Sequence, residues 1–194
     1  VATFKTWNGI AVGGYSETLS IRVAAAVDDA TERSDDTNFA TNGGANSDIF
    51  VGRSGAAGNP FWYSAQRFQN VTIPAGSTIN SATITFTASV TDASLLSYVD
   101  KIYGNDVDSA ANFTTDADIV NRAVTTANAS WTMPTAVTAD STYTSSDCAA
   151  VVQEIIDRAG WASGNALMLI QKPDAGDLTS GNFQYYSYSA STTK

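Results

Sequence analysis

Residues 68–89 read FQNVTIPAGSTINSATITFTAS, and this stretch decides the fold class. Over residues 82–89, apolar residues alternate strictly with threonine and serine. Successive side chains of a strand point to opposite faces of a sheet. The alternation therefore predicts a strand with one face in a core and a Thr-lined face toward water. Residues 65–73 predict a second strand with a bulge near Asn70, and residues 74–77 (PAGS) predict the turn between the two.

Turn signals separate several further short apolar runs along the chain. The run ALMLIQ is apolar almost throughout, which is typical of a central strand. Many short strands and one covering helix predict a mainly all-β chain folded as a jelly-roll-like antiparallel β-sandwich. The further strand-like runs lie within residues 20–32, 48–53, 97–107, 123–133, 166–171 and 182–191.

Residues 146–159 predict the one short α-helix. Ser146 or Asp147 is expected as its N-cap. The helix is expected to end at Gly160 in the left-handed conformation, with Trp161 packing back on the last turn. Its apolar side comprises Val151, Val152, Ile155 and Ile156.

The sequence predicts two units along the chain. Residues 1–19 are expected to form a short N-terminal appendage, an assembly or anchoring segment. Asn8-Gly9 within it is a hairpin signal, because both residues accept positive φ. Residues 20–194 are expected to form the β-sandwich domain.

Composition argues against several classes of function. With 10 basic and 19 acidic residues the net charge is -9, so neither nucleic acid nor an anionic membrane is an expected partner. No apolar run is long enough for membrane insertion. Histidine is missing, which removes the commonest general base and metal ligand. The single cysteine, Cys148, is expected as a buried small residue, and no enzymatic activity is expected.

Four segments carry a family resemblance. They are residues 67–88, 103–131, 151–170 and 185–194, and the helix–Gly-Trp–Gly-Asn–strand part is the most specific. Over about residues 20–194 the chain resembles the DNRLRE-type β-sandwich modules of secreted bacterial proteins and bacteriophage structural proteins. The resemblance implies a scaffold, decoration or adhesion role without shared catalytic residues. It also implies a final apolar strand after the Tyr-Ser-Tyr run, which is expected to be truncated here or donated by a neighbour.

The segment DDATERSDD is the strongest candidate site in the sequence. Asp28, Asp29 and Glu32 supply carboxylate oxygens, the ligands that Ca²⁺ prefers, so a structural calcium ion is one expectation and no other cofactor is. The competing interpretation is an ordinary solvated acidic loop.

Aromatic residues give two further candidates. Trp62 and Tyr63 follow Gly-Asn-Pro in an expected loop, where their rings are suited to stacking on a glycan. Phe4 and Trp7 lie in FKTWNG, which resembles short segments that introduce phage tail and virion modules, and are candidate assembly residues.

The leading hypothesis is a non-enzymatic structural protein of an extracellular assembly. A bacteriophage virion subunit is the first expectation, either as capsid decoration (cement) or as a tail-associated protein, partnered by other virion proteins and by copies of itself. One alternative is a carbohydrate-binding or adhesion module of a secreted bacterial protein. Another is a filament subunit that exchanges strands, with residues 1–19 as donor. The expected location is the virion or the cell exterior.

Overall fold

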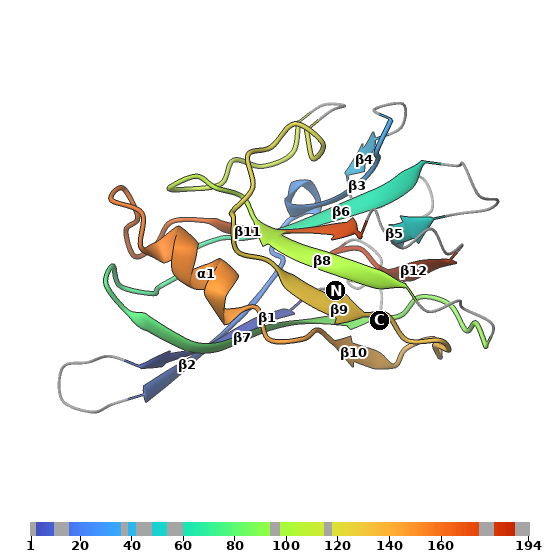
Figure 1. Ribbon diagram of the computed structural model, residues 1–194, viewed down its shortest axis with the longest axis horizontal. Helices are drawn as coiled ribbons and strands as arrows, with labels where there is room; N and C mark the ends of the chain where they lie inside the picture. The colour runs from blue at the N-terminus through green and yellow to red at the C-terminus, as the bar shows by residue number, and fades with distance from the viewer. Residues whose placement is uncertain are drawn as a thin grey trace.

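The computed structural model (Figure 1) describes residues 3–9, 16–35, 39–41, 48–53, 60–93, 98–114, 118–174 and 181–188. Its strands form two antiparallel sheets, a four-stranded one in the order β10-β7-β1-β2 and an eight-stranded one. The larger sheet runs β12-β5-β6-β11-β8-β9, with β3 also on β6 and β4 on β3. The expected mainly-β, antiparallel sandwich-like fold with a single α-helix in the described chain is confirmed.

The strands of the smaller sheet are β1 (Thr3–Gly9), β2 (Ser16–Arg22), β7 (Thr78–Thr87) and β10 (Thr142–Thr144). Those of the larger sheet are β3 (Asp29–Arg33), β4 (Phe39–Thr41), β5 (Asp48–Arg53), β6 (Phe61–Phe68), β8 (Val99–Gly104), β9 (Ala129–Thr132), β11 (Leu167–Pro173) and β12 (Gly181–Tyr186). A 3-10 turn, η1 (Ala26–Asp28), precedes β3, and helix α1 spans Ala149–Ile156.

The alternation in β7 gives the two faces that the sequence predicted. Ala82, Ile84 and Phe86 are buried, while the threonines between them are half-buried on the outer face. The turn before β7 has Gly76 at φ +76°. The bulge expected near Asn70 is instead a break after β6, where Asn70 adopts φ +54°.

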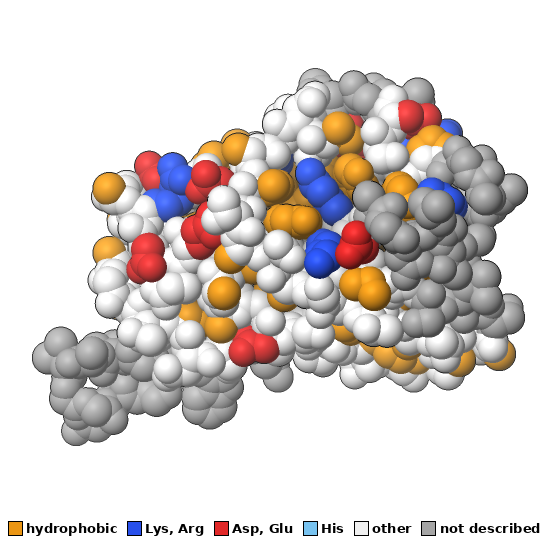
Figure 2. Space-filling view, in the orientation of Figure 1, with side chains coloured by type: hydrophobic (Ala, Val, Ile, Leu, Met, Phe, Trp, Pro, Cys, Tyr) orange, Lys and Arg blue, Asp and Glu red, His pale blue; other side chains and the backbone are white. Residues whose placement is uncertain are grey.

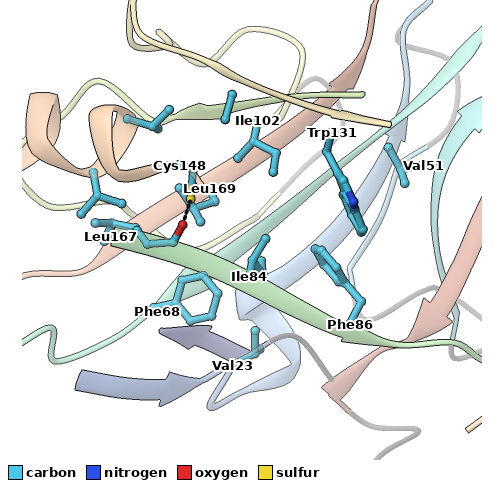
Figure 3. Packing of buried hydrophobic residues seen from close by; sticks show 14 of the residues in the cluster. Val23, Val51, Phe68, Ile84, Phe86, Ile102, Trp131, Cys148, Leu167 and Leu169 are labelled. Atoms are coloured by element: carbon cyan, nitrogen blue, oxygen red, sulfur yellow. Dashed lines mark hydrogen bonds between the residues drawn. The ribbon is translucent and has the colours of Figure 1, made fainter. Parts of the chain in front are cut away.

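The main core lies between the two sheets and under α1. Figure 3 shows Phe68, Ile84, Phe86 and Trp131 converging there. The ring of Phe86 lies 4.4 Å from that of Tyr185 and 5.7 Å from that of Trp131, centroid to centroid. Close aromatic packing of this kind adds to the free energy gained by burying apolar surface.

Helix α1 covers the end of this core and is shorter than predicted. Cys148 holds the N-cap position without a side-chain cap, while Asp147 Oδ1 accepts hydrogen bonds from the amides of Ala149 (3.0 Å) and Ala82 (2.8 Å). Cys148 is buried as expected, and its thiol donates to the carbonyl of Ala82 at 3.3 Å (Figure 3). The prediction of a left-handed Gly160 is wrong, since positive φ occurs at Gly164 (+100°).

A second, smaller core lies on the other face of the larger sheet. Residues 105–114 and 118–125 lie on this face, and their Phe113 and Ile119 pack with Met168 and Ile170 of β11. Strand β11 is therefore buried on both faces, as expected of the central strand.

The N-terminal residues belong to the smaller sheet. Strand β1 pairs with β7 from Thr3↔Thr85 to Gly9↔Thr78, and β2 pairs with β1 along its length. The predicted boundary between residues 19 and 20 falls inside β2. In the described residues, the segment expected as an appendage thus contributes β1 and the first four residues of β2 to this sheet. No described helix has the length and apolar character to cross a membrane.

Candidate functional site

Asp28, the first candidate calcium ligand, is fully buried, and both of its carboxylate oxygens accept hydrogen bonds from side chains of the same chain. Its Oδ1 accepts from Arg67 Nη1 at 2.6 Å, and its Oδ2 accepts from Gln69 Nε2 at 2.5 Å. Arg67 Nε also donates to the carbonyl of Ala110 at 2.7 Å. This ion pair joins η1, β6 and the segment that covers the second core.

Asp29 and Glu32 are also buried, and they stand on opposite faces of β3. Asp29 Oδ2 accepts from the amide of Tyr188 at 2.7 Å. Glu32 Oε2 accepts from the amides of Ile119 (2.6 Å) and Val120 (2.9 Å) on the other face. The interpretation as a solvated acidic loop is wrong for Asp28, Asp29 and Glu32, which are buried, whereas Asp35 is exposed in a turn.

The three carboxylates do not converge on one point. Each binds a different partner, and no group of three acidic or thiol side chains suited to a metal ion occurs among the described residues. The chemistry of these oxygens is that of structural acceptors. Glu32 in particular ties the segment 118–122 to the sheet.

Removing this acceptor is expected to destabilise the fold. Glu32→Ala leaves two amides without their acceptor, one buried and one half-buried, which costs about 2–4 kcal/mol in unfolding free energy. Glu32→Gln keeps an acceptor oxygen and is expected to cost less. Urea denaturation measures the loss, and hydrogen exchange should show Ile119 and Val120 amides exchanging faster.

Glu154→Ala is the matched control for this prediction. Glu154 likewise accepts from two amides, those of Thr126 (2.8 Å) and Ala127 (2.7 Å), but near the surface. Water can replace the Glu154 carboxylate at the surface, so Glu154→Ala should lower the unfolding free energy less than Glu32→Ala does. Equal losses for Glu32→Ala and Glu154→Ala would contradict the role assigned to Glu32.

Trp62 and Tyr63 lie in strand β6, whereas the sequence placed them in a loop. As consecutive strand residues they point to opposite faces, so they do not form one stacking platform. Both are half-buried. The Trp62 ring lies 5.8 Å from that of Phe50, and the Tyr63 ring faces Lys172, whose Nζ is 5.3 Å from the ring centroid.

Phe4 and Trp7 are placed by the register of β1. Phe4 stands opposite Ile21 and Ile84, and Trp7 stands opposite Thr18 and Ser81. The side chains of Phe4 and Trp7 lie outside the described part of the chain, so their candidate role in assembly stays a prediction.

The register of the larger sheet brings together residues that the sequence analysis missed. On the outer face of this sheet, Lys172 of β11 stands directly opposite Lys101 of β8. Tyr63 of β6 and Tyr103 of β8 flank the two lysines. We call Tyr63, Lys101, Tyr103 and Lys172 the basic–aromatic patch. Figure 2 shows two basic groups near the middle of the view, with hydrophobic side chains around them and an acidic group beside one of them.

The two lysines of the patch have different surroundings. Lys101 Nζ lies 3.6 Å from Asp174 Oδ2 and donates to Ser130 Oγ at 3.1 Å. Lys172 makes no ion pair with any described residue. Burial lowers the pKa of Lys172, and the negative charge of Glu32 partly opposes this shift. Burial, with a smaller effect of the neighbouring Tyr103, raises the pKa of Tyr63.

The inner face of the larger sheet carries a buried polar band. In it, Gln66 Nε2 donates to Tyr185 OH at 2.6 Å, and Gln171 Nε2 donates to Asp100 Oδ2 at 2.9 Å. Ser64 Oγ donates to Gln171 Oε1 at 2.9 Å. The members of the band are Asp29, Ser64, Gln66, Asp100, Gln171 and Tyr185, all at most 2% exposed.

The carboxyls of this band have strongly perturbed acidity. Burial raises the pKa of Asp100 to about 8 and that of Asp29 to about 7. Perturbed carboxyls can mark catalytic sites. Here both lie inside the core, where a substrate does not reach them in the folded state. The band therefore bears on stability rather than on chemistry at a surface.

A shallow, open hollow of about 650 Å³ lies beside the outer side of α1. Arg158, Asp106 and Glu154 in this hollow already have partners in the chain. Arg158 forms ion pairs with Asp106 and Asp108, and Glu154 accepts hydrogen bonds from the amides described above. The lining residues are Asp106, Thr126, Ala150, Gln153, Glu154, Asp157 and Arg158.

Comparison with known proteins leaves the chain without an assigned family. No protein-family description matches the sequence, and no curated protein matches it.

Proposed function

We propose that this chain is a non-enzymatic structural subunit of an extracellular assembly, with a bacteriophage virion as the leading setting. In that setting it serves as capsid decoration or as a tail-associated protein, partnered by other virion proteins and by copies of itself. The observation that carries the proposal is the edge of the smaller sheet, formed by β2.

Strand β2 has the features of a pairing edge. It is seven residues long, and among the described residues it pairs only with β1. Leu19 and Ile21 on its inner side pack against the main core, while Thr18 and Ser20 are exposed on the outer side. A long edge strand with its core-facing residues in place is a template for another strand. The charged residues of β2, Glu17 and Arg22, stand near its two ends and leave residues 18–21 uncharged.

A second strand on this edge would extend the sheet and its apolar face together. If two copies pair about a twofold axis, Leu19 and Ile21 of each copy lie beside those of the other. Pairing of this kind gives an isologous contact, the commonest kind in homo-oligomers. The resemblance to phage structural modules supports the same setting.

Charges added to β2 are expected to weaken self-association. Thr18→Glu with Ser20→Glu places like charges across the paired edge, and we expect the dissociation constant of the oligomer to rise tenfold or more. Light scattering after size-exclusion chromatography and analytical ultracentrifugation measure it. The matched control is Thr83→Glu with Thr87→Glu, which adds the same charge to the same outer face on β7, two strands inward.

Two results would overturn the proposal. One is a wild-type chain that stays monomeric at high concentration and binds no virion or other particle. The other is equal weakening by the β2 and β7 variants, which would assign the contact to the sheet face and not to its edge.

The basic–aromatic patch favours a second candidate, a carbohydrate-binding or adhesion module. The strand-exchange alternative has less support, because β1 pairs with β7 of its own chain.

A further inference from the structure

The basic–aromatic patch contains a local electrostatic conflict. Lys101 and Lys172 occupy directly opposite positions on neighbouring strands, and like charges at such positions destabilise a sheet. Asp174 lies 3.6 Å from Lys101 and offsets one of the two charges. Lys172 makes no ion pair with a described residue, and the negative charge that acts on it, that of Glu32, lies beyond ion-pair distance.

The positive charge of Lys172 is held in a partly buried setting. Lys172 is half-buried, with its ammonium 5.3 Å from the centre of the Tyr63 ring. Glu32 attracts it from beyond ion-pair distance, with one carboxylate oxygen held by the amides of Ile119 and Val120. Partial burial strengthens the attraction of an external anion, because solvent screens the charge less.

The aromatic members add a second kind of contact. Tyr63 and Tyr103 are half-buried on the outer face and flank the lysines. Rings on a sheet face offer flat apolar surface with a hydroxyl at the end. A pyranose ring presents a C–H face to such surface, and a carboxylate on the same sugar reaches an ammonium.

We propose that the basic–aromatic patch binds a carboxylate-bearing sugar of the uronic-acid or sialic-acid class. The carboxylate lies between Lys172 and Lys101, and the sugar ring lies on Tyr103, while the Tyr63 ring holds the ammonium of Lys172 in place. A neutral sugar has no negative charge to pair with the two lysine ammonium groups, so it binds more weakly. A polyphosphate backbone finds two lysines only, too few for the many phosphate contacts on which nucleic-acid affinity depends.

The test is isothermal titration of the full chain with trigalacturonate and with its methyl ester, which is the same sugar without charge. We expect the acid to bind and the ester to bind at least tenfold more weakly. Lys172→Gln is expected to weaken binding of the acid about five- to tenfold, and Tyr103→Ala a comparable amount. Sialyllactose against lactose repeats the comparison for the second sugar class.

Two variants control for charge and folding. Arg22→Gln removes one positive charge from exposed β2 and is expected to leave binding unchanged. Asp174→Asn removes the carboxylate that competes for Lys101, so it is expected to tighten binding of trigalacturonate about two- to fivefold. This gain cannot come from misfolding.

The proposal is overturned if acid and ester bind alike, if neither acidic sugar binds, or if Lys172→Gln and Arg22→Gln have equal effects. It is also overturned if Lys172→Gln changes only the self-association of the chain, which would assign the patch to a contact between copies. The patch and the β2 edge lie on different sheets, so failure of one proposal leaves the other standing.

Discussion

Phe86→Ala is expected to lower the free energy of unfolding by about 3–5 kcal/mol. Phe86 is fully buried in β7 and touches the rings of Trp131, Phe183 and Tyr185, so its loss opens a cavity against aromatic side chains of the larger sheet. The rigid aromatic neighbours relax little into such a cavity, so we expect the loss of unfolding free energy to lie toward the upper end of this range. Urea denaturation followed by tryptophan fluorescence measures it.

Thr83→Ala is the matched control on the same strand. Thr83 is half-buried on the outer face, and its substitution is expected to change stability by no more than about 0.5 kcal/mol. Phe86→Leu should fall between the two. If Phe86→Ala and Thr83→Ala had equal effects, the assignment of the two faces of β7 would be wrong, and with it the packing of the two sheets.

The second large effect is a fall in stability as pH rises from 5 to 9. In the folded chain the pKa of Asp29 is about 7 and that of Asp100 about 8, against 3.8 for each as an ordinary side chain. Between these values the folded state holds protons that the unfolded chain releases. The contribution of these carboxyls is therefore fully present below about pH 4 and is lost as pH rises through 7 and 8.

The expected loss between pH 5 and pH 9 is on the order of 7 kcal/mol, since the two folded-state pKa values lie about two and three units above pH 5 and each unit corresponds to about 1.4 kcal/mol. Asp100→Asn removes one titrating group while keeping the shape and an acceptor for Gln171. Its unfolding free energy should depend less on pH, and above pH 8 the variant should be more stable than the wild type.

Glu17→Gln, a change of the same charge on exposed β2, is the control and should leave the pH profile parallel to that of the wild type. Thermal and urea denaturation at one-unit pH intervals measure all three proteins. A flat wild-type profile from pH 5 to pH 9, or an unchanged slope in Asp100→Asn, would refute the assignment.

The features that the sequence predicted well are those that depend on local patterns of apolar and polar residues. The faces of β7, the position of β5, the burial of Cys148 and the central place of β11 all follow from patterns within about ten residues. The helix end shows the limit of such patterns. Gly160 was expected to supply positive φ, but its missing Cβ instead makes room for the carboxylate of Asp108, which a Cβ at that position would meet.

The burial of the acidic segment and the formation of the basic–aromatic patch could not be predicted, because both depend on residues far away in the sequence. Asp28 and Glu32 can be buried because Arg67 donates a hydrogen bond to Asp28, and the amides of Ile119 and Val120 donate to Glu32. No residue near Asp28 or Glu32 in the sequence indicates these partners. The pairing of Lys101 with Lys172 requires the strand order β6-β11-β8, which the sequence analysis did not predict.

The place of β11 has a consequence for how the chain folds. It is the middle strand of the larger sheet, with β6 on one side and β8 on the other, yet it comes late in the chain: Ser64 and its partner Gln171 are 107 residues apart. During synthesis β6 and β8 leave the ribosome long before the strand that joins them. Assembly of the larger sheet is therefore a late and slow event, dominated by long-range pairing, and the unpaired backbone edges of β6 and β8 need protection from aggregation until β11 has been synthesised.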